Sequence, residues 1–503
     1  MKSNYLYKVF FLMLALPVIT SCSKDFLEVN PVGLNLESNY YKNPTEALAG
    51  LVAAYDPLGM EAAGTYANKL GPLNSASDDC NAGGAQGGND MKTWQVWHKY
   101  TLDPANGPQA EYWTRNFTGV ARANTILAKL DNVPGLNAGT KARYIAEAKF
   151  LRGYYYFDLV RLFRNVPLFT SPVEGDQIYQ AVQVAPEEVY KQIEEDLKAA
   201  IPDLPPTVPA ATEGGRATRG AAKALLGKVI LYQNNNGRML EAAELFEDIN
   251  KAGNAYGYAL LPNYGDIFRP DKKYNSESVF EIVHTSVANS GWGGWPNFEG
   301  NVYTQMIGPR AYNGSLYESG WGFNPVRTEL ATLLHGDERY KYTVADIDSM
   351  VANGYAQPYE ASHENTGYFI QKWAPLKQWK STGGGNAELN YLNNTQEIRL
   401  ADTYLMESEA LVRGGGDLVK AAYYLNAVRA RVHLPAVAAT LENIYKERRL
   451  ELATEGHRWF DLVRTGQAAT VLAFKGFIAG KHEVLPIPLA ELNNTKLIQN
   501  PKY

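Results

Sequence analysis

The 503-residue chain is poor in the residues that build disulfide frameworks and metal centres. It has two cysteines, Cys22 and Cys80, and seven histidines that are scattered with no i,i+4 pair. Two cysteines exclude a disulfide framework, and histidines without such spacing or a cysteine partner give a zinc site no support. The glycine-rich stretch 83–88 lacks the Lys-Ser/Thr pair of a phosphate loop, and no dinucleotide fingerprint is present. We therefore expect no metal site and no cofactor.

The chain also lacks an excess of charge and a long apolar run outside its first residues. The formal net charge is −5, and charged residues make up 20% of the chain. A basic footprint for nucleic acid is therefore absent, and we expect no nucleic-acid partner. Hydrophobic residues at 45% are normal for a globular protein with a large core.

The one apolar run, residues 9–16, lies at the N-terminus behind Lys2 and Lys8. It is too short to span a bilayer and is typical of a signal peptide. The residues Ile19-Thr-Ser-Cys22 resemble a bacterial lipobox, in which the cysteine is acylated and becomes the mature N-terminus. We therefore predict a signal peptide over 1–21 and lipidation of Cys22; the alternative is plain cleavage for secretion.

Apolar residues at spacings of three and four predict paired helices in most of the remaining chain. Glycine- and asparagine-rich turns at 132–135, 234–237 and 414–416 separate the members of each pair. The hairpins resemble degenerate tetratricopeptide repeats, although no fixed period links them. We expect a mainly α protein in which 22–503 form a single domain, with the helical scaffold at about 109–163, 218–252, 396–431 and 441–466.

Two regions, about 75–100 and 262–395, are instead rich in glycine, asparagine and aromatic residues. We expect them to be long irregular insertions that face the ligand, because loops on a rigid scaffold concentrate binding residues. Indole and phenol rings cover the apolar face of a sugar while polar groups bind its hydroxyls. Alternatively, some of these rings hold the insertions on the helices, and the adjacent aspartates form an Asx turn. The candidate ligand-binding residues are Trp292, Trp295, Trp321, Tyr317, Asp78, Asp79 and Trp94.

A dense run of charges and aromatics occupies residues 444–466 near the C-terminus. Three pairs of an arginine and a carboxylate lie three residues apart and so neighbour one another on a helix: Arg448 with Glu451, Arg458 with Asp461, and Asp461 with Arg464. This spacing favours a partly buried lattice of ion pairs over a catalytic role for Glu451 or His457. Gly456 is expected to separate two helical pieces. The sequence E-R-R-x-E-L-A-x-E-G-H-R-W-F-D-L-V-R-T-G from Glu447 strongly resembles the C-terminal signature of the SusD/RagB family of outer-membrane glycan-binding lipoproteins.

The resemblance, together with the lipobox and the paired helices, covers the chain from Cys22 to Tyr503. It implies a single SusD-like domain on a lipid-anchored, surface-exposed protein of the outer membrane. It also implies that the protein binds an oligosaccharide or polysaccharide without catalysis and delivers it to a SusC-like TonB-dependent transporter. Two alternatives remain at this point: a lipid-anchored glycan-degrading enzyme, and a helical-repeat adaptor that binds only protein.

Overall fold

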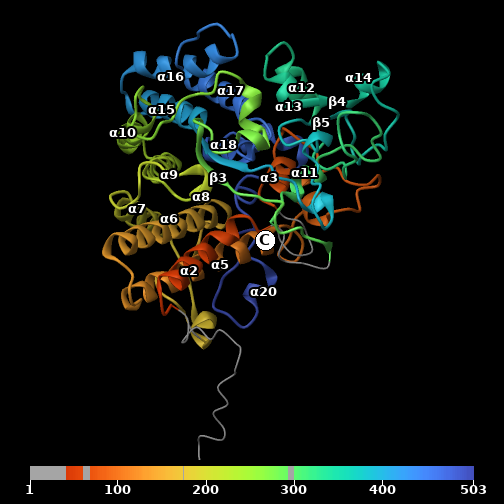
Figure 1. The fold of residues 1–503 in the computed structure, drawn as a ribbon. Helices are drawn as coiled ribbons and strands as arrows, with labels where there is room; N and C mark the ends of the chain where they lie inside the picture. Colours follow the sequence, from red (N-terminus) through yellow and green to blue (C-terminus); the bar gives the residue numbers. More distant parts are fainter. Residues whose placement is uncertain (1–40, 61–67, 174, 293–298) are drawn as a thin grey trace, which may run out of the picture.

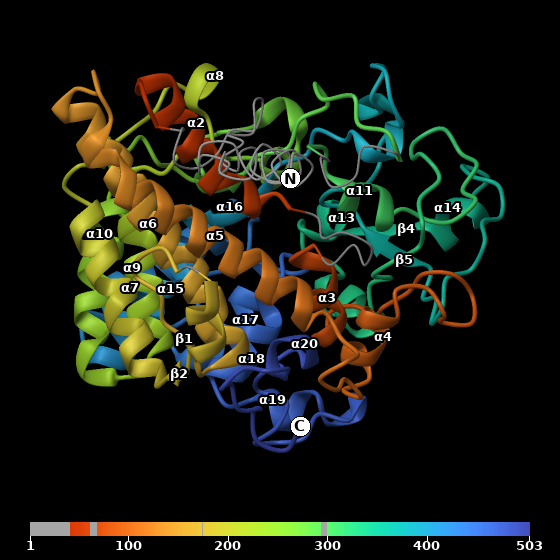
Figure 2. The same cartoon turned by 90° about the horizontal axis from the view of Figure 1, so that it is seen from below.

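The computed structural model describes residues 41–60, 68–173, 175–292 and 299–503. Long helices gather on one side of the molecule, and short elements joined by loops form the other side (Figure 1; Figure 2). The predicted mainly α fold is therefore confirmed. The long helices are α2 (Pro44–Tyr55), α5 (Gln109–Lys129), α6 (Ala138–Phe163), α7 (Pro186–Ala200), α9 (Arg219–Tyr232), α10 (Met239–Asn250), α15 (Leu400–Gly414), α16 (Leu418–Arg431) and α17 (Leu441–Glu451).

The three predicted hairpins are present as the pairs α5–α6, α9–α10 and α15–α16. Thr218 caps α9, because its hydroxyl accepts a hydrogen bond from the backbone N–H of Ala221 at 3.1 Å. Glycines permit close helix contacts: a Cβ added at Gly227 of α9 would lie 2.7 Å from the Phe246 ring of α10. Helices α2 and α7 extend the stack beyond the predicted scaffold.

One boundary of the predicted scaffold is wrong. Residues Thr395–Arg399 form strand β6 rather than the first turn of a helix, and α15 begins only at Leu400. The strand pairs antiparallel with β3 (Ser278–Ile282), where Phe280 lies opposite Ile398. Pairing with a segment more than 100 residues away overrides the local helical pattern. The sheet connects the two sides of the molecule, since the Phe280 ring packs edge-on against Phe150 of α6 at 5.0 Å.

The remaining helices and strands of the described residues are short, both inside and outside the insertions. Two further strand pairs are β1 (Val166–Pro167) with β2 (Gln183–Val184) and β4 (Val344–Asp346) with β5 (Tyr368–Ile370). The short helices are α3 (Leu70–Ala76), α4 (Lys92–His98), α8 (Ala210–Glu213), α11 (Val302–Met306), α12 (Thr328–Leu334), α13 (Tyr340–Thr343), α14 (Ile347–Ala352), α18 (Arg458–Arg464), α19 (Ala468–Val471) and α20 (Leu489–Leu492).

The C-terminal signature forms the predicted lattice of buried ion pairs. Glu451 of α17 lies at its centre and pairs with Arg399 at the end of β6, Arg431 of α16 and Arg339 of the insertion. All four side chains are at most 3% exposed. Because its arginines come from three different parts of the chain, the lattice holds the insertion against the helices.

Some individual ion pairs of the lattice differ from those that the three-residue spacing predicts. Arg448 does not pair with Glu451; it binds Asp402 at 2.7 Å and Asp461 at 3.2 Å. The predicted pair of Asp461 and Arg464 is present at 2.8 Å. Gly456 lies between α17 and α18 with a φ of +76°, as expected for a residue that ends one helical piece before the next begins.

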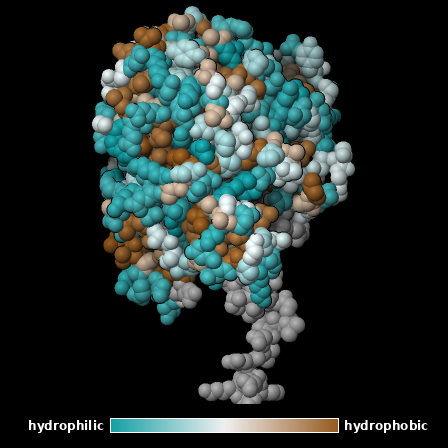
Figure 3. Space-filling model, turned by 60° about the vertical axis from the view of Figure 1, so that its left-hand side comes forward, coloured by the Kyte–Doolittle hydropathy of each residue, from teal (hydrophilic) through white to brown (hydrophobic). Residues whose placement is uncertain are grey.

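The surface of the helical side is mostly hydrophilic with scattered apolar patches (Figure 3). Exposed apolar side chains there include Leu240 of α10 and Leu418, Val419 and Tyr423 of α16. Within the described residues, no helix has the length and apolar character needed to cross a membrane.

Candidate functional site

Close backbone contacts join four loop segments of the insertions in two pairs. Gly83 has a φ of +72°, and a Cβ there would lie 2.3 Å from the carbonyl oxygen of Gly322. Gly385 has a φ of +80°, and its Cβ would lie 2.2 Å from the carbonyl oxygen of Asn289. Only glycine fits these positions, so the glycines noted in the sequence join the 75–100 loop to the 320 segment and the 385 segment to the 290 segment.

Two of the predicted aromatic residues meet where these segments converge. The rings of Trp292 and Trp321 stack at a centroid distance of 6.0 Å with an interplanar angle of 27°. Trp321 is half-buried and is fixed by its backbone N–H, which donates to the carbonyl oxygen of Gln305 at 3.1 Å. Trp292 is 43% exposed, so part of an indole surface faces solvent. We call Trp292 and Trp321 the tryptophan pair.

Polar side chains border the tryptophan pair on both sides. The indole N–H of Trp292 donates to the Glu388 carboxylate at 2.9 Å, and the Asn386 amide donates to the same oxygen at 3.2 Å. On the other side, Arg310 donates to the carbonyl oxygen of Trp321 at 3.1 Å. Arg310 also lies 3.3 Å from Glu360, which is half exposed. The arrangement supplies an apolar ring surface edged by hydrogen-bonding groups, which is the chemistry that a sugar requires.

Asp78 and Asp79 lie in ion pairs with the C-terminal signature rather than at a ligand surface. Asp78 accepts two hydrogen bonds from Arg458, at 2.7 and 3.0 Å, and Asp79 lies 3.3 Å from Arg449. Burial would raise the pKa of Asp78, but Arg458 and Arg449 outweigh it and lower the pKa below its usual range. Burial raises the pKa of Asp79. Neither of the two predictions for these aspartates, ligand binding or an Asx turn, included arginine partners.

Trp94 and Tyr317 are also buried. Trp94 has no exposed surface and packs against Phe323 at a centroid distance of 5.1 Å. It therefore contacts the chain two residues after Trp321. Tyr317 is 4% exposed, and its hydroxyl donates to Gln371. The structure therefore gives both rings a packing role, which was the alternative weighed for the insertion aromatics. Trp295 and Cys22 lie outside the described residues.

Glu388, Asn386 and Arg310 were missed by the sequence reasoning. They are ordinary polar residues in irregular segments, and nothing in their spacing singles them out. The one available signal was the Gly383–Gly385 run directly before Asn386 and Glu388, which marks a turn and hence an exposed loop.

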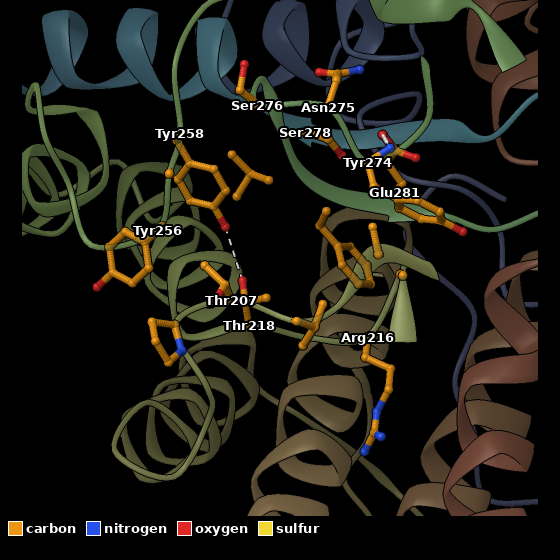
Figure 4. Close-up of a pocket in the computed structure, with 18 residues that line it drawn as sticks. Thr207, Arg216, Thr218, Tyr256, Tyr258, Tyr274, Asn275, Ser276, Ser278 and Glu281 are labelled. Atoms are coloured by element: carbon orange, nitrogen blue, oxygen red, sulfur yellow. Dashed lines mark hydrogen bonds between the residues drawn. The ribbon is translucent and has the colours of Figure 1, made fainter. Parts of the chain in front are cut away.

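A separate hollow of about 180 Å³ lies between the 206–218 segment, the 256–258 turn and β3 (Figure 4). Its aromatic residues are Tyr256, Tyr258 and Tyr274, and the first two stack at 5.6 Å. Its polar groups already have partners within the protein: Thr218 bonds Tyr258, Ser276 donates to the carbonyl of Ala259, and Glu281 accepts from Asn394. This hollow therefore offers a ligand fewer hydrogen-bonding groups than its composition suggests.

Comparison with known proteins gives a consistent result over the whole chain. Residues 304–503 match the family model described as the SusD family, and residues 26–231 match the one described as "Starch-binding associating with outer membrane". A solved laminarin-binding SusD-like protein is 45% identical, with a TM-score of 0.87 over 92% of this chain and 100% of that chain.

Two further relatives are more distant. Surface glycan-binding protein A from Bacteroides thetaiotaomicron, solved with laminarihexaose, is 29% identical, with a TM-score of 0.83 over 91% of this chain and 99% of that chain. SusD-like protein P2 of Formosa agariphila is 26% identical over 99% of both chains. The fold and the relatives define a SusD-like protein. The chain belongs to the SusD family, as its C-terminal signature indicated.

Proposed function

We propose that this protein captures a glycan of the laminarin class at the tryptophan pair, without cleaving it. The observation that carries the proposal is the half-exposed Trp292 stacked on Trp321, with Glu388, Asn386 and Arg310 at its borders. Stacking against an indole covers the apolar face of a sugar ring, and the bordering groups bind its hydroxyls. Laminarin is favoured because the 45% identical relative binds it and the 29% identical relative was solved with laminarihexaose.

Substitution of Trp321 by alanine tests this proposal. We expect Trp321→Ala to weaken laminarihexaose binding about tenfold or more, because the variant loses stacking area and the support beneath Trp292. Isothermal titration calorimetry gives the affinity, and chromatography of the same samples detects cleavage products. Tyr355→Ala is the matched control, since Tyr355 is 71% exposed and belongs to the same insertion. Unchanged affinity in Trp321→Ala would contradict the site, and released oligosaccharides would favour the enzyme alternative.

We also propose that the protein is held at the outer membrane, on the cell surface, through acylation of Cys22. The lipobox-like residues before Cys22 support this, and so does the membrane association named in one matching family description. Several acyl chains on one residue anchor a protein stably, whereas a single chain does not. From there it delivers glycan to a SusC-like TonB-dependent transporter, a step that rests on the family resemblance.

The anchor has a direct test in cells. We expect the wild-type protein to incorporate labelled palmitate and to sediment with outer membranes, and Cys22→Ser to lose both properties. The same Cys22→Ser protein is expected to retain laminarihexaose affinity, because Cys22 precedes the described domain. Membrane retention of an unlabelled Cys22→Ser protein would overturn the anchor.

A further inference from the structure

A second hollow lies on the irregular side of the molecule. It is formed by the 263–270 segment, Tyr342 of α13, Asn393 and the segment from Gln371 to Trp379, and its volume is about 190 Å³. Neither residue of the tryptophan pair lines it.

Aromatic side chains form much of its wall. Trp379 is half-buried at the end of a short helical turn, Lys377–Trp379. Tyr342 lies against the backbone of Gly265, where an added Cβ would be 2.3 Å from a ring carbon. Phe268 is buried and packs edge-on against Trp373 at 5.5 Å. These contacts fix the Phe268 and Tyr342 rings before any ligand arrives, which lowers the entropic cost of binding.

One amide oxygen in the wall has no hydrogen-bond partner among the described residues. Asn393 is only 4% exposed and lines the hollow. Among the described residues, no group bonds its side-chain oxygen. A buried amide without a partner is costly, because it loses water and gains nothing in return. In the hollow of Figure 4, by contrast, Thr218 bonds Tyr258 and Ser276 bonds the carbonyl of Ala259.

The charged groups around the hollow are already neutralised. Arg269 lies 2.7 Å from Asp271 and 3.7 Å from Asp266. Lys372 lies 2.6 Å from Glu455 of the ion-pair lattice. Since these charges are paired, the groups of the wall that can serve a ligand include the amide oxygen of Asn393, the amide of Gln378 and the indole N–H of Trp379. Aromatic walls with amides suit a neutral, polyhydroxylated ligand better than an ion.

We propose that this hollow is a second saccharide-binding site, which takes one or two neutral sugar residues of the captured glycan. Trp379 covers the apolar face of a sugar, and Asn393 bonds a hydroxyl. This inference rests on the proposed function, since it assigns a second site for the same class of ligand. Two sites on one protein hold a polymer more tightly than a short oligomer that occupies only one of them.

The experiment observes Trp379 directly. The protein carries Trp292→Ala and Trp321→Ala, so that the tryptophan pair is absent, and is labelled with nitrogen-15 in its tryptophans. The indole signal of Trp379 is identified by its loss in an added Trp379→Phe substitution. Laminarihexaose and soluble starch are titrated separately against this protein, and wild-type binding is measured alongside by calorimetry.

We expect the Trp379 signal to shift saturably with laminarihexaose, and Asn393→Leu to weaken that shift about fivefold or more. In the otherwise wild-type protein, Trp379→Ala should weaken binding of long laminarin more than binding of laminarihexaose. Tyr355→Ala, again the exposed control, should change neither.

Two results would overturn the inference, and they are distinguishable. If wild-type protein binds laminarihexaose but the Trp379 signal stays fixed with both saccharides up to about 10 mM, the second site does not exist. If wild-type protein binds no saccharide at all, the proposed function fails and the second site fails with it. A shift with starch alone would retain the site and change the glycan assigned to it.

Discussion

Replacing Arg399 with methionine is expected to lower the free energy of unfolding by about 3–5 kcal/mol, because the substitution removes one partner of buried charges. Arg399 is 1% exposed and donates to Glu277 at 3.0 Å, to Glu455 at 2.8 Å and to Glu451. Burial alone would raise the pKa of Glu451, but Arg431, Arg399 and Arg339 together hold it well below its usual range. Without Arg399, these carboxylates keep their desolvation cost and lose part of the attraction that offsets it.

Urea denaturation of wild type and variant measures the difference. Lys191→Ala is the control, since Lys191 forms a 3.9 Å pair with Glu195 in which the two side chains are 77% and 57% exposed. We expect that substitution to change stability by less than about 0.5 kcal/mol. Adding Glu451→Gln to Arg399→Met should lower stability further, because the buried Arg431 and Arg339 then also lose a charged partner. A loss below about 1 kcal/mol in Arg399→Met would show that the lattice contributes little.

Local sequence patterns predict some parts of this fold, whereas contacts between distant segments, such as those of Arg399, are not predictable in this way. The long helices were predictable because their apolar spacing, caps and turns are local, as Thr218 of α9 illustrates. Strand β6 was not, because its partner β3 lies more than 100 residues away. A cluster of ion pairs was predictable from the density of charges in residues 444–466. Arg399 and Arg339, which pair with Glu451, come from distant segments and were not predictable as its partners.

The candidate site was predictable only as a set of regions. Trp94 and Trp292 both lie next to glycine-rich loops in sequence, yet one is fully buried and the other is 43% exposed. Which indole faces solvent depends on segments far along the chain that pack against it, such as Phe323 against Trp94, and no local pattern encodes that. The role of Asp78 depends on Arg458, which is 380 residues further along the chain.

Acidification is expected to destabilise the protein steeply below about pH 4, because buried carboxylates in ion pairs must take up protons. Burial would raise the pKa of Asp158, but Lys69 and Arg161 outweigh it and lower the pKa to about 2. Arg448 and Arg464 likewise lower the pKa of the buried Asp461 to about 2. The unfolded chain has ordinary aspartate pKa values near 3.9, so below that pH it binds protons that the folded protein does not.

The sign follows from these values. The contribution of each carboxylate is fully present above about pH 4 and is lost as the pH falls from about 4 to about 2. A shift of nearly two pKa units corresponds to about 2–3 kcal/mol for each group, so the two together remove about 5 kcal/mol. Urea midpoints measured from pH 7 to pH 2 give this profile directly.

The Asp461→Asn variant measures the contribution of a single carboxylate to the pH dependence of stability. The variant should be less stable than wild type at pH 7, because Arg448 and Arg464 lose a charged partner at 3.2 and 2.8 Å. The difference between the two proteins should shrink as the pH falls from about 4 to about 2, since wild-type Asp461 then becomes neutral as well. A difference that stays constant over this interval would mean that Asp461 titrates normally and that its ion pairs do not stabilise the folded state.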